Sequence, residues 1–522
     1  MSLAKIPDDR SHLTLPVSNT EDRSRLKHTL FQTNAFEILS RLTSSHRHQV
    51  GKEISTSSTH VKYFFYSTVQ VVHVIPVAEC ERHLFSIYFP KHDSKHQQEP
   101  DLRRAGTIDI PNQSIAWNCR FTMAESKADL GQASPLPLPE GIESSYVDCT
   151  SSCGLGFHIL SSGKDEFRSK PLILLVHGYP ELAFSWRKLI PSLAAKGYYV
   201  VAPDQRGYGR TAGWDTSSWE KVDLMQFTMT NLVRDLVCLV YALGYKKVHC
   251  IIGHDFGAVS SAMASLMRPD VFTSCIQMSH PHHAPPTPPW ATGEAKSSPS
   301  TSGPKATPKT IQDSLKQLDP PRKHYKWYNS GPDAANDWNN PSQGLQAFLR
   351  GYFHVKSADW AKNDPHPLKA WNAEQLATMP HYYIMPLNAT MPQAVSGSME
   401  GEDANTTKKW LPDDDLAVYV SEWQRTGFQG ALNWYRAQTS QSPQQQRDML
   451  LFAGRKIEVP CCFISGKQDW GNYQQPGAID SYSETCTDFR GVTFVEHAGH
   501  WVQQEQPEKA LDAIFAFLDR LK

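Results

Sequence analysis

One short stretch of this sequence combines a potential nucleophile with the residues that a sharp turn requires. Gly253-His254-Asp255-Phe256-Gly257 follows an apolar run and precedes a segment with helical character. A strand-to-helix turn of this kind holds the residue at its tip above a sheet, and glycines allow backbones to approach where a Cβ would collide. The following helix offers free N–H groups at the same point. The pattern predicts a nucleophilic carboxylate at Asp255, although a helix-capping aspartate in an ordinary turn would also satisfy these five residues.

A carboxylate that forms an ester needs a base, and the base needs a partner, for the second step. The candidate base is His500, in Gly499-His500-Trp501 after the last predicted strand, and the candidate partner is Asp469, which follows an earlier strand. Each alone could be a buried histidine or a turn residue. The chain order Asp255, Asp469, His500 is the order of nucleophile, acid and histidine in one class of hydrolases. We therefore expect these side chains to meet.

Backbone donors near the nucleophile are predicted from a third segment. His177-Gly178-Tyr179-Pro180 follows the apolar run 172–176, which has the composition of a buried strand. Gly-Pro turns are common, but in such hydrolases a turn at this place supplies one donor to an oxyanion, and the residue after the nucleophile supplies the other. The expected donors are the N–H groups of Tyr179 and Phe256.

Alternating strand and helix patterns surround these motifs from Leu136 onward. They indicate a mostly parallel sheet, of the α/β class, that helices cover on both faces. The predicted strands are 172–176, 198–202, 248–252, 271–278, 459–464 and 491–495, and the predicted helices are 224–243, 258–267 and 507–521.

A long insertion, 284–450, interrupts the sheet pattern. It begins with a Pro-, Ser- and Thr-rich stretch, 284–310, that we expect to be a mobile loop, and continues with an aromatic-rich helical stretch, 311–380. The polar stretch 386–415 is expected to be a second loop, and 415–436 a helix. Because α/β sheets bind ligands at the carboxyl ends of their strands, the insertion is expected to form a lid there.

The chain is therefore expected to have four parts. The N-terminal extension, 1–135, is polar and poorly defined apart from the β-prone stretch 61–78, and translation could begin at Met123. The other parts are a first core segment, 136–283, the lid, 284–450, and a second core segment, 451–522.

Composition narrows the classes of partner. The 522 residues carry a net charge of -1, without a long basic run or an acidic tail, which gives no electrostatic reason to expect nucleic acid or an anionic membrane. The ten cysteines are scattered through apolar stretches without zinc-ligand spacing, which favours reduced thiols and no metal. No stretch has transmembrane length and no apolar leader follows Met1, so the expected location is cytoplasmic.

Residues 136–521 resemble a soluble epoxide hydrolase of the α/β-hydrolase superfamily. GHDFG narrows the resemblance to members with an aspartate nucleophile, and TGFQGALNWYR resembles the lid segment that carries a ring-opening tyrosine. The matching segments are HGYPELAFSWRKLIP at 177, APDQRGYG at 202, GHDFG at 253, TGFQGALNWYR at 426 and AGHWVQQEQP at 498.

The resemblance implies a function and a set of roles. The α/β-hydrolase fold with a helical lid would open a small-molecule epoxide through an ester on Asp255, and water would then release a diol, without a cofactor. Tyr435 takes the place of the lid tyrosine. The second lid tyrosine is matched by Tyr325, with Tyr328 as the alternative. The remaining residues expected to line the site are His177, Gly178 and Trp501.

Two departures and two other functions remain open. The stretch 284–310 is longer than the resemblance implies before the lid, and the N-terminal 120 residues do not resemble the phosphatase-like domain of some vertebrate members. A haloacid or haloalkane dehalogenase uses the same Asp, His and acid, but such enzymes usually have Trp where this chain has Phe256. A binding protein without catalysis is the other alternative. The oligomeric state is left open.

Two further sets of polar residues are expected to have no part in the chemistry. The histidines 280, 282 and 283 stand beside the Pro-rich loop and are expected on the surface rather than around a metal. Glu181 is expected to help start a helix.

Overall fold

The computed structural model describes residues 72–74, 85–87, 133–283, 308–440 and 442–521. The chain divides into two compact units, Met1–Asn118 and Cys119–Lys522. In the first unit the described residues are β1 (Val72–Val74) and β2 (Phe85–Ile87), which pair antiparallel. The predicted loop 284–310 lies almost wholly outside the described residues. Among the described helices, none combines the length and apolar character that a membrane span needs.

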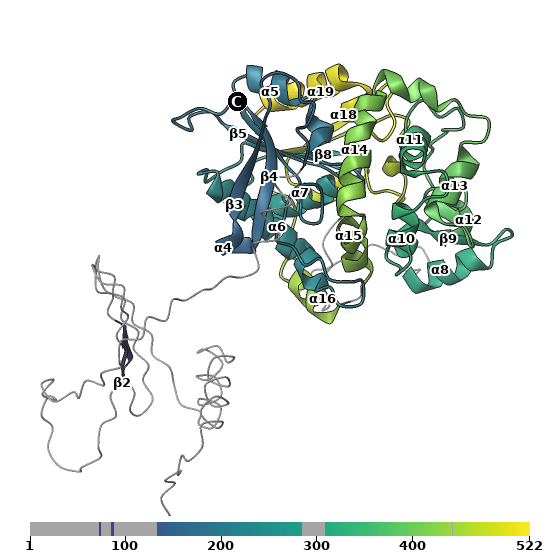
Figure 1. Cartoon of the computed structure of the whole chain (residues 1–522), viewed down its shortest axis with the longest axis horizontal. Coiled ribbons are helices and arrows are strands. Elements are labelled where there is room, and N and C mark those ends of the chain that lie inside the picture. Colours follow the sequence, from purple (N-terminus) through teal and green to yellow (C-terminus); the bar gives the residue numbers. More distant parts are fainter. Residues whose placement is uncertain (1–71, 75–84, 88–132, 284–307, 441, 522) are drawn as a thin grey trace, which may run out of the picture. The chain divides into compact units, whose positions relative to one another are not determined.

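An eight-stranded sheet forms the centre of the second unit, as far as its residues are described (Figure 1). Its order is β12-β11-β8-β7-β5-β6-β4-β3, and the six strands from β12 to β6 are parallel. The antiparallel ladder of β4 and β3 closes one edge. The strands are β3 (Glu143–Cys149), β4 (Leu155–Ser162), β5 (Leu172–Val176), β6 (Tyr199–Pro203), β7 (Cys250–His254), β8 (Cys275–Met278), β11 (Cys461–Gly466) and β12 (Phe489–Val495).

Helices cover both faces of this sheet, because successive apolar residues of its strands point to opposite faces. In β5, Leu172, Leu174 and Val176 pack with α6 (Met229–Ala242) and α7 (Phe256–Met267). Ile173 and Leu175 pack on the other side with α5 (Ile190–Ala195) and α19 (Pro507–Asp519). The expected α/β-hydrolase architecture is confirmed.

Short elements follow several strand ends and shape the loops there. The helix predicted over 224–243 is interrupted at Thr228, whose extended backbone separates a 3-10 turn from α6. The short elements are α4 (Thr150–Cys153), η2 (Ala183–Trp186), η3 (Leu224–Phe227), η5 (Trp470–Asn472), α17 (Tyr482–Thr485) and α18 (Val502–Glu505).

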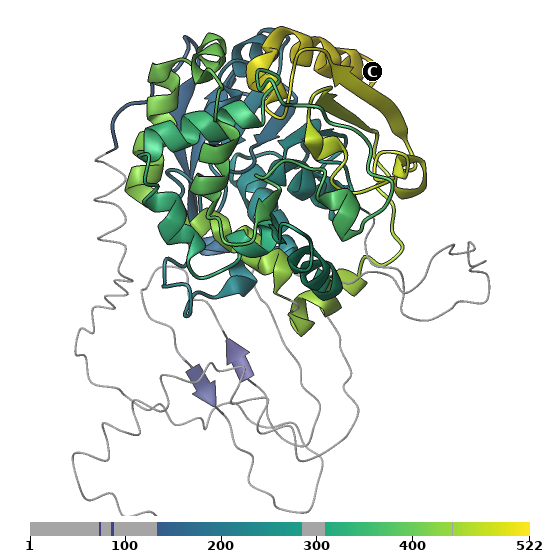
Figure 2. The same cartoon turned by 90° about the vertical axis from the view of Figure 1, so that its right-hand side faces the viewer.

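The insertion between β8 and β11 forms a separate helical layer on one side of the sheet (Figures 1 and 2). Its aromatic core continues into the sheet domain through Tyr179, Phe256 and Trp501. Its elements are α8 (Pro308–Lys316), β9 (Arg322–His324), α9 (Tyr325–Asn329), α10 (Ala334–Asn339), α11 (Leu345–Val355), α12 (Ala373–Leu376), β10 (Ile384–Pro386), α13 (Met391–Ser398), η4 (Ala404–Lys409), α14 (Asp413–Thr426), α15 (Gln429–Thr439) and α16 (Pro443–Leu450).

Two expectations for this layer were wrong. The helix expected over 415–436 is two helices, α14 and α15, because Gly427 takes a positive φ of 64° and ends the first. The stretch 386–415, expected to be a loop, contains α13 and η4. A capping box between Thr390 and Gln393 starts α13, a signal that the polar composition concealed.

Backbone crowding around the turn at 253–257 gives a stability prediction. A Cβ at Gly257 would lie 2.0 Å from the carbonyl oxygen of Val176, whereas a Cβ at Gly397 in α13 would meet nothing within 4 Å. We expect Gly257→Ala to lower the free energy of unfolding by about 1–3 kcal/mol. The matched variant Gly397→Ala should raise it by about 0.5–1 kcal/mol. Urea unfolding measures both, and equal effects would contradict the crowding argument.

Candidate active site

The turn between β7 and α7 presents Asp255 in a strained backbone conformation. Asp255 has φ 52° and ψ -114°, a region that side chains other than glycine rarely adopt. The glycines on either side permit it: a Cβ at Gly253 would lie 1.9 Å from the oxygen of Gly257. The strand therefore runs directly into the helix, and the residue between them projects from the sheet.

The carboxylate of Asp255 is held by a backbone donor from the neighbouring strand end. Tyr179 N–H donates to Oδ1 over 3.0 Å. A Cβ at Gly178 would stand 2.4 Å from the Cβ of Asp255, so only glycine fits there. Phe256 is the first residue of α7, where an N–H has no partner within the helix. Of the two expected backbone donors, the Tyr179 N–H binds the Asp255 carboxylate, and the Phe256 N–H belongs to the next residue in the chain.

His500 and Asp469 meet Asp255 from the last two strands of the sheet. His500 Nδ1 is 3.1 Å from each carboxylate oxygen of Asp469, and Nε2 is 3.4 Å from Asp255 Oδ2. Nε2 makes no hydrogen bond with the described residues. Gly471 N–H donates to Asp469 over 2.6 Å and fixes that carboxylate. The structure therefore brings together the three residues that the sequence placed at separate strand ends.

Burial and neighbouring charges act in opposite directions on these carboxylates. Burial alone would raise the pKa of Asp255, but the His500 ring and the Lys356 ammonium hold it well below its usual range. Burial also raises the pKa of Asp469, but the His500 ring and the Gly471 N–H lower it by more. The net effect is a lowered pKa for Asp469. Both groups are therefore carboxylates at neutral pH.

Two tyrosines of the helical insertion lie near the turn that carries Asp255. Tyr435 on α15 is 4% exposed, and its ring centroid lies 4.6 Å from that of Phe256 and 5.8 Å from that of Tyr325. Tyr325, the first residue of α9, donates its hydroxyl to Gln474 Oε1 over 3.2 Å. Burial raises the pKa of both phenols well above 10, so both keep their protons at neutral pH.

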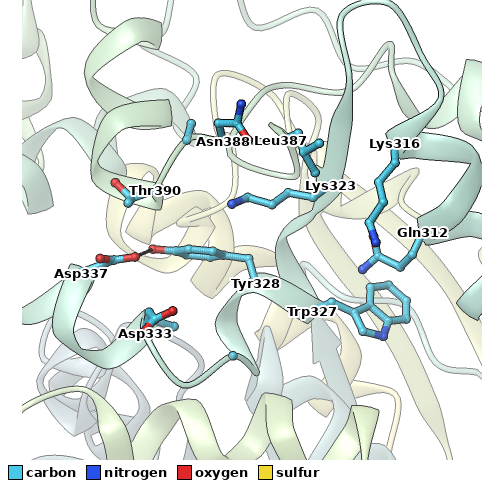
Figure 3. A pocket seen from close by; sticks show the side chains of 13 residues that line it. Gln312, Lys316, Lys323, Trp327, Tyr328, Asp333, Asp337, Leu387, Asn388 and Thr390 are labelled. Carbon is cyan, nitrogen blue, oxygen red and sulfur yellow. Dashed lines mark hydrogen bonds between the residues drawn. The ribbon is translucent and has the colours of Figure 1, made fainter.

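Tyr328, the alternative to Tyr325, lies in a different pocket (Figure 3). Its hydroxyl donates to Asp337 Oδ2 over 2.7 Å, and Lys323 lies 4.8 Å above its ring. This open pocket of about 700 Å³ is lined by lid residues alone. Of the two tyrosines, only Tyr325 packs against Tyr435.

His177 and Trp501 are buried next to the residues of the site, and their ring nitrogens make hydrogen bonds within the described protein. His177 is fully buried; its Nδ1 pairs with the carbonyl of Gly178, and its Nε2 accepts from Gln205 N–H over 3.1 Å. Both ring nitrogens are thus engaged within the protein, and neither is available to a substrate. Trp501 packs edge-on to His500, with ring centroids 4.7 Å apart, and donates Nε1–H to Phe353 in the lid over 2.9 Å.

Glu181 is not the helix-starting residue that the sequence suggested. Its side chain is completely buried and lies 2.6 Å from His254 Nδ1, while Gln503 and Gln504 donate to the same carboxylate. His254 Nε2 in turn contacts the carbonyl of His500 over 2.7 Å. The pair therefore fixes the backbone of the base, a role that no local pattern around Glu181 reveals.

Lys356 is a buried cation that the sequence analysis missed. It is 4% exposed, and its ammonium lies 5.2–5.3 Å from the ring centroids of Tyr352, Tyr383 and Trp501. Aromatic faces attract a cation and partly offset its lost hydration. Burial lowers the pKa of Lys356 while Asp255 and Asp469 raise it. The lysine thus supplies positive charge near two carboxylates without forming an ion pair among the described residues.

Glu505 connects the helical insertion with the loop that carries His500. Its carboxylate accepts N–H groups from Ala358 in the lid and from Gly499 and Trp501, at 2.8–2.9 Å. Next to this clamp, His500 N–H donates to the Lys356 carbonyl over 2.9 Å. One acidic side chain therefore satisfies three backbone donors, in the insertion and on both sides of His500.

Comparison with known proteins points to one family. A model of the alpha/beta hydrolase fold matches residues 171–321. An epoxide hydrolase of Caballeronia sordidicola is 26% identical over 369 residues, which are 70% of this chain and 91% of that protein. Epoxide hydrolase B of Mycobacterium tuberculosis is 27% identical over 358 residues, 67% of this chain and 92% of that protein.

The comparison with solved structures also finds epoxide hydrolases. An epoxide hydrolase from an endophytic Streptomyces superimposes with a TM-score of 0.55 and 27% identity, covering 73% of this chain and 97% of that one. Potato (Solanum tuberosum) epoxide hydrolase I superimposes with a TM-score of 0.51 and 26% identity, covering 73% and 99%. Within the described residues, no group of three His, Cys, Asp or Glu side chains is placed to hold a metal ion.

The Glu505 clamp gives a prediction about stability. In Glu505→Gln an amide NH₂ replaces an oxygen and faces a backbone N–H, so one buried donor loses its partner. We expect the free energy of unfolding to fall by about 1–3 kcal/mol. Glu508→Gln, an exposed change three residues later, is the matched control and should cost much less. Chemical unfolding measures both, and a Glu505→Gln variant as stable as its control would disprove the clamp.

Proposed function

The chain belongs to the epoxide hydrolase family of α/β-hydrolases, and from this we propose that it hydrolyses an epoxide to a vicinal diol through an ester on Asp255. One observation carries the proposal. Asp255 is a carboxylate with one oxygen bound by the Tyr179 N–H and the other 3.4 Å from His500 Nε2, and its charge acts on two buried, protonated tyrosines, Tyr325 and Tyr435. These are the groups that the two half-reactions need.

Ring opening joins a nucleophile to carbon and releases an alkoxide. An Asp255 oxygen attacks one epoxide carbon and the C–O bond on that carbon breaks. Tyr435 and Tyr325 hydrogen-bond the departing oxygen, and one of them gives it a proton. Because both phenols are protonated at neutral pH, they can act as the acid, and Asp255 needs no base to activate it.

Hydrolysis of the ester uses His500 and the backbone N–H groups near Asp255. His500 Nε2 takes a proton from water, and the hydroxide attacks the carbonyl carbon of Asp255. The oxyanion is stabilised by the N–H groups of Tyr179 and Phe256, each worth about 3–4 kcal/mol in such sites. Collapse frees the product oxygen and restores the carboxylate. Of the two water protons, one ends on the product and one restores the tyrosine.

Asp469 orients the base for this step. Its contact with Nδ1 selects the tautomer in which Nε2 is free to accept a proton, and its charge stabilises the imidazolium that forms. Lys356 limits the repulsion between the buried carboxylates. The insertion 308–450 acts as the lid that carries both tyrosines and excludes water during ring opening.

Removing the base should trap the intermediate. We expect His500→Gln to form the ester and stall, because nothing then activates water. Intact-mass spectrometry of this variant after exposure to a panel of neutral epoxides should show an adduct equal to a whole epoxide. Peptide mapping should place it on the peptide that contains Asp255.

The controls separate this function from its rivals. The double variant Asp255→Ala/His500→Gln should take up no mass. An adduct formed from a haloacid or haloalkane, with loss of the halogen, would instead make the protein a dehalogenase. No adduct with any epoxide or halide would refute covalent catalysis by Asp255.

The lid tyrosines give a second test. Tyr435→Phe and Tyr325→Phe each remove one hydrogen-bond donor to the epoxide oxygen, so we expect each to lower the rate of ester formation by about 10²–10⁴-fold. Tyr328→Phe is the matched control because its hydroxyl lies in another pocket (Figure 3), and it should leave that rate unchanged. Rapid-mixing fluorescence measures ester formation. A larger loss for Tyr328→Phe than for Tyr325→Phe would reverse the assignment.

A further inference from the structure

A small cavity lies between the core and the lid, beside Tyr325. Its volume is about 100 Å³. From the core it is lined by His280, His283 and Gln474, and from the lid by His324 and Lys326. His324 also stacks on the Tyr325 ring, with centroids 5.1 Å apart and planes 20° apart. The cavity therefore adjoins one of the two proposed acids.

The histidines of this region are not surface residues, as the sequence had suggested. His282 is 5% exposed, and its neighbours 280 and 283 are half-buried. Burial lowers the pKa of His280 to about 4 and that of His324 to about 3, and the Lys326 ammonium lowers both further. At neutral pH these rings are uncharged, so each has one N–H. His324 Nδ1 accepts the N–H of Lys326 over 3.2 Å, so its proton is on Nε2, which can donate. His280 donates its Nδ1–H to the Pro281 carbonyl over 3.1 Å, so its Nε2 is an acceptor.

Among the described residues, Lys326 is the charged group of the cavity and has no anionic partner. The described residues that line the cavity include no Asp or Glu, and the ion pairs within the described part of the chain do not include Lys326. Burial lowers the pKa of its ammonium, while the charge of Asp255 raises it. A half-buried ammonium among hydrogen-bond donors gains most from an anion, because an unpaired charge away from water is costly.

Gln474 connects the cavity to the reaction centre. Its Oε1 accepts the hydroxyl of Tyr325 over 3.2 Å, so the oxygen end of the amide points to the tyrosine. The NH₂ end remains free to donate to a group in the cavity. An anion there would be held by Lys326, by the Nε2–H of His324 and by this amide, a set that suits the flat, two-oxygen shape of a carboxylate.

We propose that this cavity is a subsite for a carboxylate carried by the substrate, so that the preferred substrates are epoxides with a carboxylate on a short chain. The proposal rests on the proposed function and names its substrate class. Because burial lowers the pKa of Lys326, a fall in pH favours its charged ammonium, so the binding of a carboxylate strengthens as the pH falls. A neutral epoxide lacks this dependence because it places no charge in the cavity.

The test compares two substrates of nearly the same shape, one with a charged carboxylate and one with a neutral carboxamide. An epoxide that carries a carboxylate and the corresponding carboxamide are assayed with the native chain, and the ratio of their kcat/KM values is measured. We expect a ratio of at least 10 in favour of the acid, rising as the pH falls from 8 to 6. Lys326→Gln should reduce the ratio to near 1, and Lys326→Arg should largely restore it.

Lys323→Gln is the matched control, because it removes a lysine three residues away that lines the separate pocket of Figure 3. It should leave the ratio unchanged. An equal kcat/KM for acid and amide in the native chain, or an unchanged ratio in Lys326→Gln, would overturn the subsite. Melting temperatures of the variants show whether each is folded.

A second measurement does not depend on turnover. Sodium butyrate should raise the melting temperature of the native chain, and should do so far less for Lys326→Gln; butyramide should have little effect on either. No difference between butyrate and butyramide would overturn the subsite even if epoxides are hydrolysed. A butyrate effect that needs Lys326, together with no epoxide adduct in His500→Gln, would instead support the subsite while refuting the proposed function.

Discussion

The crowded turn at Asp255 is the constraint on which the rest of the site depends. A non-glycine residue at φ 52° costs of order 1–3 kcal/mol, so the surroundings must exclude relaxed alternatives. They do so because the backbones of β5, β7 and α7 approach each other at Gly178, Gly253 and Gly257 more closely than any Cβ allows. The strain is therefore sustained by packing of the whole sheet, and it aims one carboxylate at the Tyr179 N–H.

The second requirement is to bury two carboxylates close together. Asp255 and Asp469 lie on opposite sides of one histidine ring, and their repulsion is strong away from water. Lys356 compensates without touching either, because aromatic rings hold its ammonium. This arrangement has a chemical reason. A lysine bound directly to Asp255 would occupy the lone pairs that attack the substrate in the proposed mechanism, whereas a cation at a distance lowers the energy of the carboxylate and leaves those lone pairs free.

A feature could be predicted from the sequence where its signal lies within a few neighbouring residues. GHDFG carries its own turn geometry, and strand ends of a parallel sheet meet at one edge, so Asp255, Asp469 and His500 could be placed from patterns alone. The break at Gly427 and the helix after Thr390 were misjudged, because a helix end depends on a single backbone angle or cap. Glu181 was given the wrong role, and Lys356 and Glu505 were missed. Each is a charged residue whose burial is created by partners far away in the chain, and charge alone suggests a surface position.

The contacts of the helical insertion show that it supports His500, the proposed base. The stretch 353–358 accepts hydrogen bonds from His500 and Trp501 and is tied to Glu505, so its backbone is continuous with the histidine loop. Any movement of the lid that carried this stretch away would also displace the base and Lys356. In the proposed mechanism this anchored stretch keeps His500 and Lys356 in place for hydrolysis of the ester. The helix α15, which carries Tyr435, has a separate attachment to the sheet domain, because Trp434 Nε1–H donates to the Arg206 carbonyl over 2.9 Å.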